Sequence, residues 1–83
     1  MTNPFQRAMT HNVPRAKRVA AIETLIEANR TTDLAVLVRT SSLPGGLRRQ
    51  AVDGLISCGA TDLLEELADD GSVAPELRKK AQR

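Results

Sequence analysis

Aliphatic residues recur along this chain three and four positions apart, which is the spacing of one face of an α-helix. Four segments show this pattern, and a fifth segment after Pro75 leaves little room for an apolar face. The spacing predicts a helical protein rather than one built from strands. The predicted inward-facing residues are Ala21, Ile22, Leu25 and Ile26, then Leu34, Leu37 and Val38, then Leu47, Ala51, Val52, Leu55 and Ile56, then Leu63, Leu64 and Leu67.

Turn-forming residues separate these segments. Pro14 suits the first position of a helix, where its missing N–H has no helical partner. Thr31 or Thr32 is expected to cap the second helix, and Thr61 the fourth, because a threonine hydroxyl can accept from a free backbone N–H. Gly59 suits the end of the third helix. The run from 41 to 46 is the clearest loop.

The same pattern returns every thirty residues. It begins at Arg18, Arg48 and Arg78, and its first two occurrences read Arg-x-x-Ala-[Val/Ile]-acid-x-Leu-Ile. Pro14 and Pro44 are also thirty residues apart. A period of this size is typical of stacked helical repeats, in which each unit covers the apolar face of its neighbour.

Residues 1–13 show no such period, and Asn3, Pro4 and Asn12 are expected to prevent a helix there. We therefore divide the chain into an N-terminal arm, residues 1–13, and a helical domain, residues 14–83. Two hypotheses remain open for the arm. Either a partner holds it through Phe5 and Met9, or it packs on the first helix of its own domain.

The composition suits one small helical domain. The chain has 83 residues, of which 41% are hydrophobic, and Phe5 is its only aromatic residue. This argues against β-sandwiches and barrels, whose strands are rich in aromatic and β-branched residues. Cys58 is the only cysteine, so an internal disulfide is excluded. His11 and Cys58 stand alone in the sequence, which predicts no metal site because zinc needs three or four ligands.

Charge is distributed unevenly along the chain. Residues 1–50 contain eight Lys or Arg against three acidic residues, whereas residues 51–83 contain four against seven. The two parts therefore carry about +5 and −3. Such a dipole favours head-to-tail association, or an acidic partner at the N-terminal end.

The segment Thr61-Asp62-Leu63-Leu64-Glu65-Glu66-Leu67-Ala68-Asp69-Asp70, followed by Ala74-Pro75-Glu76-Leu77-Arg78-Lys79-Lys80-Ala81, resembles the short HEAT-like repeats of the phycobilisome-lyase type. The resemblance covers residues 14–83. It implies a right-handed stack of about five helices, or two and a third repeats. It also implies that Asp69 or Asp70 pairs with Arg78, whereas Arg48 finds Arg39 and Thr40 at the corresponding positions.

The basic residues at the starts of the long helices are expected to pair with acids across the turns. The alternative is an anion-binding ridge in which Arg39, Arg48 and Arg49 are the least neutralised part. Nucleic acid is the obvious ligand for such a ridge, although no aromatic stacking residues accompany it. The doublets Glu65-Glu66 and Asp69-Asp70 do not predict a catalytic pair, because adjacent helical residues point in different directions.

The sequence therefore predicts a non-enzymatic protein–protein interaction or assembly subunit, without cofactor or small-molecule substrate. The open ends of a short stack expose aliphatic surface that another protein or a second copy would cover. A structural component of a virus or phage particle is one version, and a nucleic-acid-binding module is the alternative function. The longest aliphatic run, 34–38, is too short to span a membrane. No signal peptide is visible, so we expect a cytoplasmic or virion location.

Overall fold

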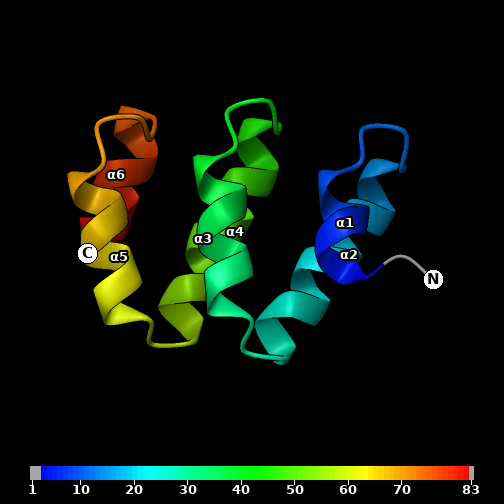
Figure 1. Cartoon of the computed structure of the whole chain (residues 1–83), viewed down its shortest axis with the longest axis horizontal. Coiled ribbons are helices and arrows are strands. Elements are labelled where there is room, and N and C mark those ends of the chain that lie inside the picture. The colour runs from blue at the N-terminus through cyan, green and yellow to red at the C-terminus, as the bar shows by residue number, and fades with distance from the viewer. Residues whose placement is uncertain (1–2, 83) are drawn as a thin grey trace.

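The regular structure of this chain is entirely helical. The computed structural model describes residues 3–82, and in that range there are six α-helices and no strand (Figure 1). The all-α class predicted from the sequence is confirmed, with one helix more than the five expected. The helices are α1 (Pro4–Met9), α2 (Arg15–Glu27), α3 (Thr31–Arg39), α4 (Gly45–Ser57), α5 (Thr61–Asp69) and α6 (Pro75–Gln82).

The six helices lie as three antiparallel pairs in a row: α1 with α2, α3 with α4, and α5 with α6 (Figure 1). The first and last pairs lie at opposite ends of the longest dimension, and the molecule measures 34 × 24 × 16 Å. Its radius of gyration, 11.7 Å, is that of a compact domain of this length. We refer to these units as the first, middle and last pair.

The N-terminal segment contains a helix, so the expectation that residues 1–13 form none is wrong. Asn3 caps α1 by accepting from the Gln6 backbone N–H at 2.8 Å. Pro4 then takes the first helical position, where a missing N–H has no cost. The two residues expected to prevent a helix therefore start one. Residues 1–2 of the predicted arm and residue 83 of the predicted domain lie outside the described residues.

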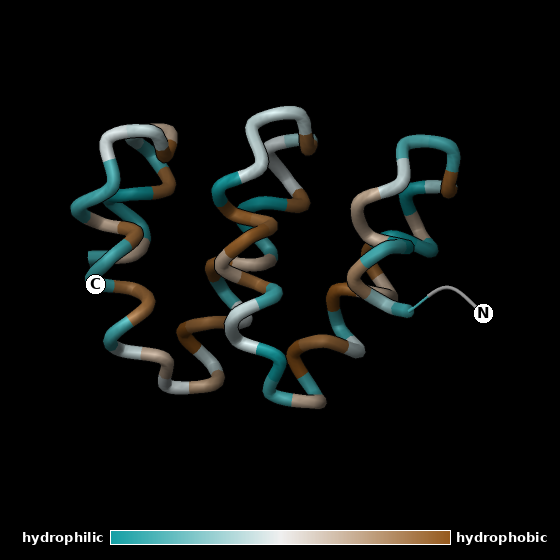
Figure 2. Tube along the Cα trace, viewed as in Figure 1, coloured by the Kyte–Doolittle hydropathy of each residue, from teal (hydrophilic) through white to brown (hydrophobic). Residues whose placement is uncertain are grey.

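One aliphatic core runs through all three pairs, and hydrophobic positions recur in every helix (Figure 2). The predicted inward-facing residues of α3 are all buried, as are most of those of α2 and α4. Ile26 and Ile56 are only partly buried. In α5 the prediction is less accurate, because Leu67 alone is fully buried while Leu63 and Leu64 are half-buried. Helix α5 belongs to the last pair, and no further pair covers it.

Two turns end the longer helices in the same way. Gly59 has φ 68° and Asn29, thirty residues earlier, has φ 58°. This left-handed conformation closes helix ends and favours glycine or asparagine, which confirms the prediction for Gly59. The threonine caps are wrong. Thr31 and Thr61 are the first helical residues, and the preceding residues make no side-chain capping bond.

The first and middle pairs approach each other most closely where α4 crosses α2. A Cβ atom added to Gly54 would lie 2.7 Å from Ile26 Cδ1 and closer still to Ile26 Cγ1. A side chain at this position would therefore require the Ile26 side chain, or the two helices, to shift. Gln50 completes the contact by donating its amide N–H to the Val19 carbonyl at 3.1 Å.

Candidate interaction surfaces

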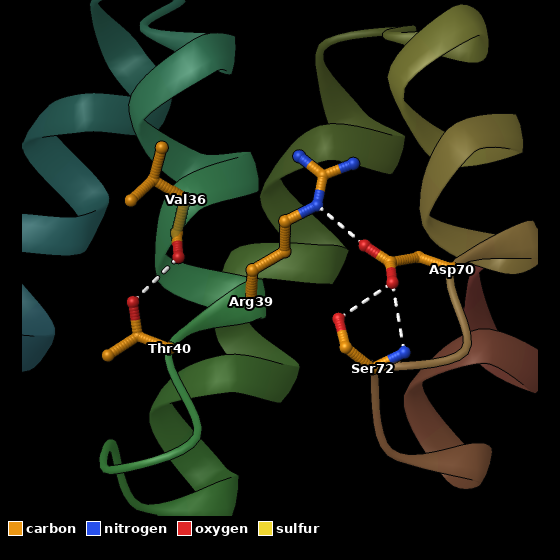
Figure 3. A network of polar contacts seen from close by, with 5 residues as sticks. All are labelled: Val36, Arg39, Thr40, Asp70 and Ser72. Atoms are coloured by element: carbon orange, nitrogen blue, oxygen red, sulfur yellow. Dashed lines mark hydrogen bonds and ion pairs between the residues drawn. The ribbon is translucent and has the colours of Figure 1, made fainter.

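Arg39, the first of the three candidate arginines, is engaged by the last pair. It lies at the end of α3, and its Nε donates to Asp70 Oδ2 at 2.9 Å (Figure 3). The other Asp70 oxygen accepts from the Ser72 backbone N–H at 2.9 Å and from the Ser72 hydroxyl at 2.6 Å. These bonds, the Ser72 hydroxyl first and then Arg39, lower the pKa of Asp70 from 3.8 to about 2. Asp70 therefore joins the turn of the last pair to the middle pair.

Arg49 is also paired across the same junction. Its guanidinium lies 2.9 Å from Glu76 on α6, and the Lys80 ammonium lies 2.9 Å from Asp53 on α4. Two of the three arginines of the candidate anion-binding ridge, Arg39 and Arg49, therefore already have carboxylate partners. Their carboxylate partners come from the following pair, twenty-seven or thirty-one residues further along the chain.

Within residues 3–82, the arginines at the repeated position make no ladder of ion pairs. Arg18 is 5% exposed, and its Nε donates to the Ala8 carbonyl of α1 at 2.9 Å. Arg48 donates to the Leu43 carbonyl at 3.1 Å. The Nε of Arg78 is buried and has no hydrogen-bond partner in residues 3–82. The predicted pairing of Arg78 with Asp69 or Asp70 is wrong: Asp70 pairs with Arg39 instead, and in the part of the chain that the structure describes no ion pair joins Arg78 to Asp69.

Phe5 and Met9 are partly buried and pack against the common core. Ala8, between them on α1, is fully buried. Of the two hypotheses for the N-terminal segment, packing on its own domain describes residues 3–13. The binding of a partner by Phe5 and Met9 stays a prediction.

Two hollows that the sequence did not single out lie at the ends of the row of pairs. One, of about 380 Å³, lies between α1 and α2, and the other, of about 240 Å³, lies between α5 and α6. We call their linings the N-end face and the C-end face. The N-end face consists of Arg7, Thr10, Asn12, Val13, Pro14 and Lys17. The C-end face consists of Glu65, Ala68, Asp69, Ala81 and Gln82.

Aligning the sequence with itself at a shift of thirty residues gives a signal for these two faces. Arg7 and Lys17 align with Leu37 and Leu47, which are buried, and Glu65 aligns with the buried Ala35. At these three positions a charged residue replaces one that is apolar and buried in the middle pair.

The residues considered for metal or thiol chemistry are isolated. His11 is exposed, and Cys58 is half-buried with its Sγ 3.5 Å from the Ile26 carbonyl oxygen. Within residues 3–82, no three His, Cys, Asp or Glu side chains gather where they could hold a metal ion. In the same range, every helix is too short or too polar to cross a membrane.

Comparison with protein-family models, with curated proteins and with solved structures finds no match to this chain. Function is therefore inferred from the contacts, charges and exposed surfaces of the chain itself. The two end faces are hollows of opposite charge, one in the first pair and one in the last pair.

Proposed function

We propose that this chain is a right-handed, HEAT-like stack of short helical repeats that serves as a non-enzymatic protein–protein interaction or assembly subunit. Several features support the repeat. Helices α2 and α4 are both thirteen residues long and begin thirty residues apart. Helices α3 and α5 are both nine residues long with the same separation. Units of this kind bury their apolar faces against each other and present elongated surfaces to partners.

The observation that carries the assembly role is the contrast between the middle and last pairs. Ala35 and Val38 of the middle pair are 2% and 1% exposed. Their counterparts in the last pair, Glu65 and Ala68, line an open hollow instead. Burying aliphatic surface releases about 25 cal/mol per Å², so a partner that covers Ala68 and the half-buried Leu64 would be stabilised there.

The proposal includes a place within a larger complex, such as a cytoplasmic assembly or a virus or phage particle. The hollows of the N-end face and the C-end face support this version, because each is a surface that another subunit could cover. The nucleic-acid-binding alternative has weaker support. A phosphate at Arg39 or Arg49 would compete with the carboxylate that each already holds.

Site-specific photo-crosslinking in the native cells tests the proposal. A photoreactive amino acid replaces Val13 on the N-end face or Ala68 on the C-end face, and exposed Ser57 on α4 serves as the control. We expect adducts of defined mass, identified by mass spectrometry, from the end faces and none from Ser57. A folded protein that gives no protein adduct at either end face would contradict the proposal.

A further inference from the structure

We propose that copies of this chain associate head to tail, with the N-end face of one copy docked on the C-end face of the next. The inference rests on the proposed role as an assembly subunit and names the partner as a second copy of this chain.

The C-end face occupies positions that the next pair covers elsewhere in the molecule. Ala35 and Val38 of the middle pair are 2% and 1% exposed, and the last pair lies beside the middle pair in the row (Figure 1). Thirty residues later their equivalents Glu65 and Ala68 line the hollow, where Glu65 is exposed and Ala68 is half-buried. The structure thus contains an example of what fills this surface, which is another helix pair.

The N-end face occupies the complementary positions. Leu67 and Leu77 are 0% and 1% exposed although no pair lies beyond the last one, so they are covered from within their own pair and from the preceding pair. Leu37 and Leu47 are buried in the same way in the middle pair. In the first pair these positions are Arg7 and Lys17, both exposed. They lie on the side of the pair where a preceding pair would dock.

The charges of the two faces are opposite. Arg7 and Lys17 are the charged residues lining the N-end face, and Glu65 and Asp69 are those lining the C-end face. Polar ends of either sign would keep a single copy soluble. Opposite signs also attract unlike ends and repel like ends, which sets the orientation of docking.

The junction between the middle and last pairs already uses this chemistry, because Arg39 and Arg49 each meet a carboxylate of the next pair. Lys80, the basic residue of α6 nearest in sequence to the C-end face, is held by Asp53 of the middle pair. It therefore does not neutralise the acidic face. A contact between two different faces builds either an open filament, which keeps one face of each kind uncovered at its ends, or a closed ring, which leaves none uncovered.

Sedimentation equilibrium of the purified full chain tests the proposal. At low salt we expect the average mass to rise with protein concentration. In 1 M NaCl the association should weaken, because the Debye length falls to about 3 Å. A wild-type chain that stays monomeric at all concentrations in low salt would overturn the inference. If such a chain still gives crosslinks to another protein, the proposed assembly role stands without self-association.

Charge reversal of each face identifies the contact. Arg7→Glu/Lys17→Glu makes both ends acidic, and Glu65→Lys/Asp69→Lys makes both ends basic. We expect each variant to be monomeric alone, and an equimolar mixture to associate because unlike faces are again available. Monomeric, folded variants that fail to associate when mixed would contradict the head-to-tail arrangement.

A matched control separates the face from its overall charge. Glu23→Lys/Glu27→Lys changes the same number of acids, four residues apart on an exposed helix surface, away from both faces. We expect it to associate as the wild type does, and equal loss of association in this control would contradict the inference. If a reversal variant loses its helical circular dichroism, Lys17→Gln and Asp69→Asn replace it. Each should weaken association by about two- to fivefold, the effect of one exposed ion pair.

Discussion

The two junctions between helix pairs share a backbone arrangement but use different side-chain chemistry. Where the first pair meets the middle pair, Gly54 lets α4 approach Ile26, and Gln50 bonds to a backbone carbonyl. Where the middle pair meets the last pair, Arg39, Arg49 and Lys80 each meet a carboxylate. Pairs of the same backbone arrangement are thus joined by close apolar contact and one amide hydrogen bond at the first junction, and by ion pairs at the second.

Ala51→Asp should have the largest effect on either junction. Ala51 is 0% exposed in α4, and a carboxylate there would be buried without a partner. An uncompensated buried charge costs on the order of 3–5 kcal/mol, comparable to the whole stability of a small domain. Far-UV circular dichroism at 25 °C should therefore show lost helix. Ser57→Asp, at an exposed position of the same helix, should remain folded, and equal behaviour of the two variants would contradict the proposed core.

Gly54→Leu should damage the first junction specifically. The new Cβ would overlap the Ile26 side chain, and overpacking of this kind costs about 1–3 kcal/mol. Urea denaturation should show a lower midpoint. Gly71→Leu is the control, because a Cβ at Gly71 meets no atom within 4 Å. A midpoint unchanged at Gly54 would mean that the helices are not in close contact there.

Asp70 should make the second junction sensitive to acid. Its pKa of about 2 in the folded chain lies below the ordinary 3.8, so the unfolded chain binds the proton first. The stability that Asp70 contributes is thus complete above about pH 4 and lost as the pH falls toward 2. Thermal melts of Asp70→Asn should lose this part of the pH dependence. The neighbouring Asp69→Asn should keep it, and a wild-type profile in both variants would exclude Asp70 as the source.

The Arg49–Glu76 pair should contribute less than about 1 kcal/mol, because both side chains are at least half exposed, at 50% and 65%. A double-mutant cycle with Arg49→Ala and Glu76→Ala measures the coupling between them. We expect it to shrink as NaCl is raised from 0.05 to about 1 M. A coupling above that bound, or one indifferent to salt, would show that the pair is shielded from solvent in a way that its exposure does not indicate.

The smallest effect is expected in a test of nucleic-acid binding. Because carboxylates already engage Arg39 and Arg49, we expect little change in the fluorescence anisotropy of a labelled DNA duplex at low salt. Tight binding that weakens steeply with salt would instead support the anion-binding ridge. Arg48→Gln would then test whether the arginine bonded to the Leu43 carbonyl takes part.

The sequence predicted helix positions well because each helix carries its own local signals. The aliphatic spacing located α2, α3 and α4, and Pro75 located the start of α6. The prediction is wrong at α1 because asparagine can either break a helix or cap its N-terminus, and Asn3 caps it. A helix of six residues also offers too few positions to show a period.

The polar contacts were harder to predict because they depend on distance between pairs rather than on position along one helix. The resemblance implies that Asp69 or Asp70 pairs with Arg78 of the same helix pair. In the structure Arg39 of the preceding pair reaches Asp70 first, and the Ser72 turn holds the carboxylate in place. The end faces were missed for a related reason. Arg7, Lys17 and Glu65 are ordinary surface residues until their thirty-residue equivalents are known to be buried.

The central position of α4 has a consequence for motion. Its substantial helix contacts reach α2, α3, α5 and α6, whereas those of α1 are with α2 alone. Local openings that expose backbone amides should therefore begin at the two outer pairs and reach α4 last. In native-state hydrogen exchange, the amide exchange rates are expected to fall from the two outer pairs toward the middle pair and to be slowest near the middle of α4. Docking of a neighbour on either end would slow exchange in that outer pair first.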